Sequence, residues 1–534
     1  MRKTPSTYLL AVLVFFFAIN SAFAVEAPRI EKKDGRYALM VEGRPYLVLG
    51  GQIHNSSAWP SELQQVWDSM AALHANTIEA PAYWEQIEAQ EGHFDFGNVD
   101  QLIEGARAHN LHVILLWFGT WKNGNMQYAP VWVKTDTKRF PRTIRPDGVP
   151  LDVLSANSRT TLEADKAAFT SLMRHLKQID GDQHTILLVQ VENESGGIGS
   201  VRDFSAESNR GFAGKVPADL LTASGKQPGT WSQVFGEDAD EVFQIYHQAK
   251  YINEIAAAGK KEFDIPCYMN AWLSHVTNEL PQRQVFLPGI QYPSGGAVQR
   301  WVGLWRALAP AIDMIAPDIY TSDSTEYRDT IHAYARPDNP LMIPETGRND
   351  AFAKFFFYAL GSGTLGFSPF GVDRTGWNIL GNEPWSAHAR NFELFAPMNR
   401  EIAALEFDGK LKTAVEEPGQ AEQELDFGEW QATVMFGFPQ QDGRKAPGTK
   451  DAHGVALIAR LGPDEFLVAG FDSSIRFHVP GQLPFIRSQV LTAEEGGYVN
   501  GEWKAKRLLN GDEVDRGISF HAQPTVVRVR MGKF

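Results

Sequence analysis

Two short stretches of this sequence place acidic side chains directly after apolar runs. Glu192 and Glu194 follow the run Thr185–Val191, and Glu345 follows Leu341–Pro344. Burying a carboxyl group costs free energy unless it has a partner. A carboxyl group at the end of a buried strand therefore indicates either a partner or a functional role. Two such groups held together can divide acid and base work, because one stays ionised while its neighbour keeps a proton.

The elements around these acids follow a regular pattern. Short apolar runs alternate with helix-like stretches, which is typical of parallel strands covered on both faces. We therefore predict an α/β fold, a (β/α)8 TIM barrel with a C-terminal all-β, sandwich-like domain. The expected barrel strands are Tyr46–Leu49, Asn76–Trp84, Leu111–Phe118, Thr185–Val191, Ile265–Asn270, Ile312–Tyr320, Leu341–Pro344 and Thr364–Phe370.

In such a barrel the fourth and seventh strands would carry the acids to the same mouth. A small barrel leaves room only for side chains in its interior, so two glutamates there can approach to about 5–5.5 Å. Retaining glycosidases use that separation, with one carboxylate attacking the anomeric carbon and the other protonating the leaving oxygen. The residues alone do not assign the two roles. The alternative interpretation is that the acids are solvated strand ends.

Several motifs resemble one family of sugar hydrolases. The run Val189-Gln190-Val191-Glu192-Asn193-Glu194 resembles the acid/base signature of glycoside hydrolase family 35, the β-galactosidases. Asn76–Trp84 with Glu91–Phe96, and Gly51–His54, resemble that family's second-strand and first-strand regions. The resemblance covers roughly residues 40–405, and a bacterial branch of the family carries a similar all-β appendix.

The resemblance implies that Glu194 is the acid/base and Glu345 the nucleophile, with Glu192 supporting the site. Family members often have a tyrosine where this chain has Ser195 and another where it has Asn55. The usual Ala-Glu sugar-binding pair after strand three is replaced by Trp121–Gly124. These departures fall in the sugar subsite, so they bear on galactose specificity more than on the mechanism.

Further residues are candidates for binding the substrate. Asn193 is placed to donate to a sugar hydroxyl near the reacting carbon, and Tyr320, at the end of strand six, to hydrogen-bond Glu345. Each candidate has a structural alternative, such as a core aromatic or a hydrogen-bonded core histidine. The remaining candidates are Glu79, Asn123, Lys122, His54 and Trp385.

The chain divides into three expected parts. Arg2 and Lys3, an apolar run over Tyr8–Ile19 and Ala22-Phe23-Ala24 are typical of a cleaved signal peptide, which we assign to residues 1–24. The catalytic barrel is expected over residues 25–409. Residues 410–534 turn to short strands separated by turn signals, which predicts the β-sandwich-like accessory domain. The leader predicts a periplasmic or secreted protein with no membrane span after cleavage.

Composition narrows the partners. The 534 residues carry 64 acidic and 50 basic side chains, a formal net charge of -14, which disfavours nucleic acid as a partner. A single cysteine and 14 histidines without zinc-site spacing predict no metal and no cofactor. The oligomeric state is left open.

The expected activity is that of an exported retaining exo-β-galactosidase. Its substrate would be a β-galactoside, hydrolysed from oligo- or polysaccharide side chains such as those of xyloglucan. One alternative is the same mechanism on a glucoside or arabinoside. A second is a non-catalytic carbohydrate-binding protein, which would be expected to lack one of the two glutamates that this chain retains.

Overall fold

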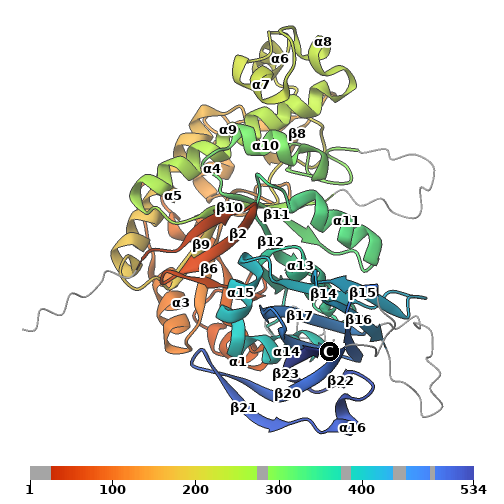
Figure 1. Ribbon diagram of the computed structural model, residues 1–534. Helices are drawn as coiled ribbons and strands as arrows, with labels where there is room; N and C mark the ends of the chain where they lie inside the picture. The colour runs from red at the N-terminus through yellow and green to blue at the C-terminus, as the bar shows by residue number, and fades with distance from the viewer. Residues whose placement is uncertain (1–25, 274–286, 374–385, 437–452, 482–487) are drawn as a thin grey trace, which may run out of the picture.

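The computed structural model describes residues 26–273, 287–373, 386–436, 453–481 and 488–534. Its centre is a closed barrel of parallel strands in the order β10-β11-β12-β13-β4-β5-β6-β9 (Figure 1). In chain order these strands are β4 Val48–Gln52, β5 Thr77–Tyr83, β6 His112–Lys122, β9 Ile186–Asn193, β10 Cys267–Trp272, β11 Met314–Ile319, β12 Leu341–Thr346 and β13 Thr364–Pro369. The predicted TIM barrel is therefore confirmed, and β9 and β12 are its fourth and seventh strands.

Helices cover the outside of the barrel, so its strands are buried on both faces. This burial agrees with the apolar runs of the sequence. The long helix α5 begins after Ser158, whose side chain accepts from the backbone N–H of Thr161. The helices of this layer are α1 Leu63–Leu73, α2 Trp84–Ile87, α3 Gly97–Ala108, α5 Arg159–Asp180, α9 Ala239–Glu262, α10 Val302–Leu308, α11 Ser324–Tyr334, α12 Asp350–Ala353, α13 Phe355–Gly361, α14 Ser386–Phe395 and α15 Asn399–Phe407.

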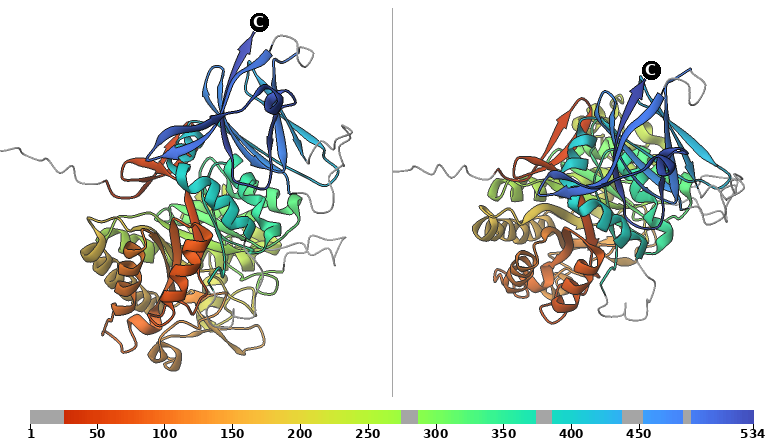
Figure 2. Two further views of the ribbon diagram at one scale, coloured as in Figure 1. Left: turned by 90° about the horizontal axis from the view of Figure 1, so that it is seen from below. Right: turned by 60° about the horizontal axis from the view of Figure 1, so that its bottom comes forward.

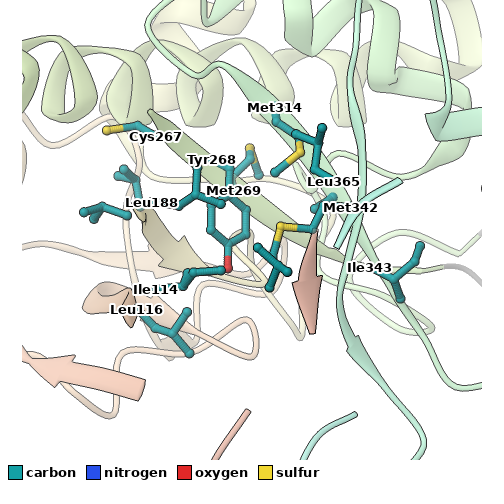
Figure 3. Close-up of a cluster of buried hydrophobic side chains, with 14 of the residues drawn as sticks. Ile114, Leu116, Leu188, Cys267, Tyr268, Met269, Met314, Met342, Ile343 and Leu365 are labelled. Carbon is teal, nitrogen blue, oxygen red and sulfur yellow. The ribbon is translucent and has the colours of Figure 1, made fainter. Parts of the chain in front are cut away.

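Apolar side chains fill the interior of the barrel below its mouth. Met314, Met342 and Tyr268 point inward from three neighbouring strands (Figure 3), and each is buried. The hydroxyl of Tyr268 lies 3.4 Å from Oε2 of Glu79, which is also inside the barrel. The barrel is thus a packed core that rigidly supports whatever lies above it.

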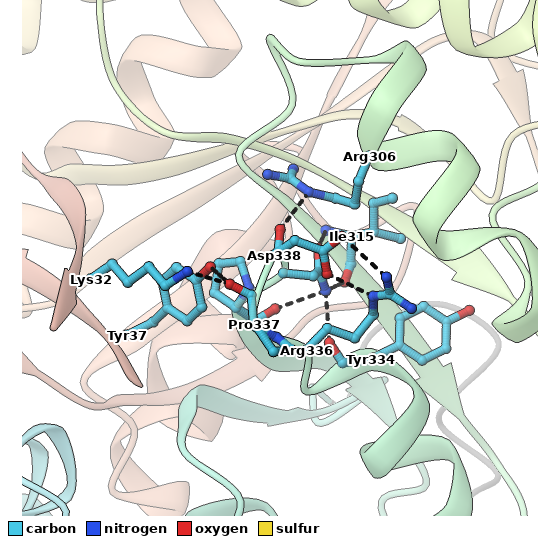
Figure 4. Close-up of polar contacts among 10 residues, drawn as sticks. Lys32, Tyr37, Arg306, Ile315, Tyr334, Arg336, Pro337 and Asp338 are labelled. Atoms are coloured by element: carbon cyan, nitrogen blue, oxygen red, sulfur yellow. Dashed lines mark hydrogen bonds and ion pairs between the residues drawn. The ribbon is translucent and has the colours of Figure 1, made fainter. Parts of the chain in front are cut away.

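A small N-terminal sheet closes the other end of the barrel. Strands β1 Arg29–Lys33, β2 Arg36–Val41 and β3 Arg44–Tyr46 pair antiparallel. Lys32 and Tyr37 of this sheet both donate to the carbonyl of Pro337, in the loop that leads into β12 (Figure 4). Because that loop precedes its strand, this contact lies opposite the end where Glu345 sits.

Two long segments leave the mouth of the barrel, after its third and fourth strands. The first contains α4 Val131–Thr135 and the hairpin β7 Arg142–Ile144 with β8 Pro150–Leu154. The second contains α6 Ala206–Phe212, α7 Ala218–Ser224 and α8 Trp231–Phe235. In Figure 1 this second segment projects at the end of the molecule opposite the C-terminal sheets.

The C-terminal part is antiparallel and forms two facing sheets, which confirms the sandwich-like prediction (Figure 2). One sheet has the order β14-β17-β18-β23-β20-β21, and the other β15-β16-β19-β22. Their bounds are β14 Leu411–Val415, β15 Glu422–Asp426, β16 Gln431–Phe436, β17 Val455–Gly462, β18 Glu465–Phe471, β19 Ser473–His478, β20 Ser488–Val499, β21 Glu502–Leu508, β22 Ile518–Phe520 and β23 Val526–Lys533, with α16 Gly511–Val514 between β21 and β22.

This part packs directly on the barrel's helices. The hydroxyl of Thr413 in β14 donates to the carbonyl of Phe357 in α13 at 2.8 Å, and the rings of Phe357 and Phe471 are 6.5 Å apart. Among the described residues, no helix is both long enough and apolar enough to cross a bilayer.

Candidate active site

The fourth barrel strand ends in an unusual backbone conformation. Glu192 and Glu194 have φ angles of 64° and 45°, values that non-glycine residues seldom adopt. The backbone N–H of Glu194 donates to Oδ1 of Asn270 at 2.8 Å, which fixes the turn to the neighbouring strand β10. Such strained positions persist where the surroundings enforce them, and they concentrate at functional sites.

The structure brings Glu194 and Glu345 together. Oxygens of these two carboxyls, and one of Asp318, lie within 4.8 Å of one another, and all three residues are buried. Inverting glycosidases separate their carboxyls by about 6.5–9.5 Å to admit a water, whereas retaining ones need about 5–5.5 Å. The observed spacing therefore fits double displacement through a covalent intermediate.

Glu345 is held at both of its carboxylate oxygens. Nε2 of Gln52, from the end of β4, donates to Oε2 at 3.0 Å. The hydroxyl of Tyr320, just after β11, donates to Oε1, which is the hydrogen bond predicted from the sequence. Two donors fix the orientation of the Glu345 carboxylate, as a nucleophile requires.

Glu194 has the opposite character. Burial, and then the nearby charge of Glu345, raise its pKa to about 7, while the cation of Lys122 acts to lower it. A carboxyl of this kind still holds a proton near neutral pH and can give it to a leaving oxygen. The two glutamates thus have the different environments that one acid/base and one nucleophile need.

A chain of amides connects the strand ends around this pair. Nδ2 of Asn270 donates to Oδ1 of Asn193 at 3.1 Å, and Nδ2 of Asn193 donates to Oδ1 of Asn123 at 3.1 Å. Nζ of Lys122 donates to the same oxygen of Asn123 at 2.6 Å. The predicted residues Asn193, Asn123 and Lys122 are therefore neighbours at the mouth.

Two other predicted residues lie away from this chain of amides. Glu79 is inside the barrel, where Ser368 and Tyr268 donate to its oxygens, and burial raises its pKa to about 8. This position supports the catalytic pair from below and gives no support to direct sugar binding. His54 is buried beside Phe370, with ring centroids 5.2 Å apart. Trp385 lies outside the described residues.

Glu192 faces away from the catalytic pair. Its oxygens accept the backbone N–H groups of Thr120 and Trp121 at 3.2 and 2.6 Å. It lies against Asp165 of α5, and burial followed by the Asp165 charge raises the pKa of Glu192 well above its usual range. Glu192 thus anchors the end of β6, which presents Lys122 and Asn123.

Sequence reasoning missed three residues of the site: Gln52, Asn270 and Asp318. Each is a single polar residue at or near the carboxyl end of a barrel strand, and each is buried. That position in an otherwise apolar strand is the signal that could have found them.

A hollow opens beside the catalytic pair, at the ends of the first three barrel strands. Its volume is about 480 Å³, and its walls combine polar groups with aromatic rings. Trp59 is 43% exposed, and Tyr83 and Tyr128 stack with centroids 5.6 Å apart. The lining residues include Asn55, Trp59, Tyr83, Lys122, Asn123 and Tyr128.

Two glutamates this close together, at the ends of the fourth and seventh strands of a TIM barrel, match the arrangement that retaining glycoside hydrolases use. Residues 38–271 match the family model of glycosyl hydrolases family 35, and residues 388–521 match a domain of unknown function (DUF5597). Residues 38–271 of the chain are therefore similar to glycosyl hydrolases family 35. Residues 38–271 end before Glu345 and include Glu194, so the match covers the first half of the barrel and the predicted acid/base.

The individual relatives share less than a third of their aligned residues with this chain. The chain is 29% identical over 231 residues to a β-galactosidase of Xanthomonas manihotis, covering 40% of this chain and 36% of that protein. Crystal structures of β-galactosidases from Bacillus circulans sp. alkalophilus and from the psychrophilic Marinomonas ef1 align at 15% and 11% identity, each with a TM-score of 0.47. Each alignment covers 67% of this chain, and 57% and 61% of those chains. The barrel is established by the chain's own strand order and pairing.

Proposed function

We propose that this protein is an exported, retaining exo-β-galactosidase. The observation that carries the proposal is the close approach of Glu345, held by two donors, to Glu194, which keeps a proton near neutral pH. The leader-like residues 1–24 support export, and the match of residues 38–271 to the family 35 model supports galactose as the sugar.

The proposed reaction has two balanced steps. The Glu345 carboxylate attacks the anomeric carbon while the bond to the leaving oxygen breaks, and that oxygen takes the proton of Glu194. Glu194, now a carboxylate, removes a proton from water, and the oxygen of that water displaces Glu345 from the sugar. We assign sugar binding beside the carboxyls to Asn193 and Asn123, whose side chains are hydrogen-bonded to each other at 3.1 Å.

The hollow beside Lys122 and Asn123 supports a substrate longer than one sugar. Trp59 offers an exposed apolar face at its rim, and amphipathic sugar rings pack on such faces. We assign this hollow to part of a polysaccharide side chain, with xyloglucan as the leading candidate. A terminal galactosyl residue would then lie against Glu194 and Glu345.

Matched aryl β-galactoside and aryl β-glucoside test the sugar. We expect the mature chain to prefer the galactoside, and proton NMR of the first product to find the β-anomer. Faster glucoside hydrolysis would replace galactose with another β-glycoside, and an α-anomeric first product would refute retention. Release of galactose from xyloglucan, without shortening of its backbone, tests the exo mode and the polymer.

Export has its own test. The full chain, produced with residues 1–24 in a bacterial host, is expected to appear outside the cytoplasm with a new N-terminus near Val25. An uncleaved cytoplasmic product would contradict the assignment, and a chain starting at Val25 serves as the control.

A further inference from the structure

A third carboxyl belongs to the catalytic cluster. Asp318 is on β11, and in the parallel pairing of β11 with β12 it stands opposite Glu345. Residues paired in this way point to the same face of a sheet, so both side chains project toward the mouth. Asp318 is 2% exposed, and one of its oxygens lies within 4.8 Å of oxygens of both Glu194 and Glu345.

The hydrogen bonds of Asp318 are incomplete. Nδ2 of Asn270 donates to its Oδ2 at 2.7 Å. Within the part of the chain that the structure describes, no N–H or O–H group with hydrogen-bond geometry serves Oδ1. Burying a carboxylate oxygen without a hydrogen-bond donor costs free energy. A proton shared with a second carboxyl supplies that hydrogen bond and removes the cost.

The charged groups around Asp318 also favour a shared proton. Glu345 must stay ionised for attack, and its neighbour Glu79 lies below it in the barrel. Lys122 is the cation that acts on both Glu194 and Asp318. Among the described residues, the other titratable groups that interact with this cluster are the neutral phenols of Tyr268, Tyr320 and Tyr334.

We infer that Asp318 and Glu194 form a proton-sharing pair, in which Asp318 stores the proton that Glu194 delivers to the leaving group. This inference rests on the proposed function and extends it. Asp318 acts through Glu194, so it is a positioning residue for the proton and does not itself touch the substrate.

The proton count supports this role. The resting cluster carries the charge of Glu345 and one charge on the proton-sharing pair. When Glu345 becomes an ester and the proton leaves with the departing oxygen, the pair holds both charges and Glu345 holds none. The cluster's total charge is therefore the same on both sides of the step, which suits a buried site. Water returns the proton when the ester is hydrolysed.

The pKa shifts agree in direction. Burial, followed by the charges of Glu345 and Glu194, raises the pKa of Asp318 well above its usual range. Two interacting carboxyls release their protons in two widely spaced steps, as in the paired aspartates of acid proteases. A pair of this kind keeps some Glu194 protonated at a pH where a lone carboxyl would have lost its proton.

The test is Asp318→Asn, because asparagine keeps the shape and can still accept from Asn270 but cannot share the proton. Its kcat/KM on an aryl β-galactoside, relative to wild type, should fall by about ten-fold or more between about pH 6 and pH 9. Asp313→Asn is the control, since Asp313 precedes the same strand at the opposite end of the barrel and pairs with Lys260 at 2.7 Å. Its activity ratio to wild type should not change with pH.

A loss of activity in Asp318→Asn that is the same at every pH would overturn the shared proton and leave a structural role. A second readout does not need activity. The infrared carbonyl band of protonated carboxylic acids at about pH 8 should be weaker in Asp318→Asn than in wild type and unchanged in Asp313→Asn, while Glu79 and Glu192 contribute equally to all three spectra. A wild-type enzyme inactive on all aryl glycosides would refute the proposed function, whereas a band of equal intensity in wild type and Asp318→Asn would refute the pair.

Discussion

The hydrogen bond from Tyr320 to Glu345 gives a quantitative test of how the nucleophile is held. Tyr320→Phe removes one hydroxyl and leaves the ring, while Gln52 continues to donate to the other oxygen at 3.0 Å. Hydrogen bonds to charged groups contribute about 1.5–3 kcal/mol, and each 1.36 kcal/mol changes a rate ten-fold. We therefore expect kcat/KM to fall about ten- to hundred-fold.

The assay is steady-state hydrolysis of an aryl β-galactoside, with thermal unfolding measured on the same samples. Tyr327→Phe is a matched control, because its buried hydroxyl lies 3.0 Å from Oγ1 of Thr346, the residue after Glu345, and touches neither catalytic carboxyl. The control should lose stability and keep its rate. A Tyr320→Phe enzyme within about three-fold of wild type would refute the reasoning, because that loss is below the weakest hydrogen bond assumed.

The same geometry leads to three further predictions. Glu194→Ala should lose most activity on substrates with poor leaving groups and regain part of it with azide; equal losses on all leaving groups would move the acid role elsewhere. Lys122→Met removes the cation that lowers the pKa of Glu194, so that pKa should rise from about 7 and the alkaline limb of kcat/KM should move to higher pH, whereas an unmoved limb would contradict the assigned charge. Trp59→Ala should raise KM about two- to ten-fold for an oligosaccharide but not for an aryl galactoside, and equal effects on both would remove the second sugar from the hollow.

The barrel was predictable because its signal is repeated along the chain. Apolar runs and helical stretches recur with a spacing that few other folds allow, and the alternation placed Glu194 and Glu345 on the correct strands. The C-terminal part was predictable in class, and its strand ends depend on turn signals such as the one between β20 and β21. Its Asn-Gly dipeptide, Asn500-Gly501, is a hairpin signal that decides against one continuous strand.

The site was less predictable because backbone conformation rearranges it. Regular strand alternation would put Gln190, Glu192 and Glu194 on one face, but positive φ angles at both glutamates turn the strand end. Glu192 consequently binds the end of β6, while Nε2 of Gln190 donates to Oδ1 of Asn193 at 3.0 Å. Asp318 has no acidic neighbour in sequence. Its role depends on the pairing of β11 with β12, and helix α11 separates these two strands along the chain.

The anchoring of Glu192 explains how an apolar barrel sustains so many charged groups at one mouth. Gly119 lies where an added Cβ would come within 2.7 Å of Oε1 of Glu192 and 3.0 Å of Oδ1 of Asp165. Asp165 in turn accepts from Nε1 of Trp117 at 2.9 Å and from the hydroxyl of Thr120 at 2.6 Å. Each carboxyl oxygen of Glu192 and Asp165 thus accepts a hydrogen bond from a group of β6. These hydrogen bonds offset the cost of burying the two acids, and they fix the strand that carries Lys122. The charge of Lys122 lowers the pKa of Glu194, whereas the charge of Glu345 raises it. Glu192 and Asp165 therefore influence the pKa of Glu194 indirectly, because they hold the strand that positions Lys122.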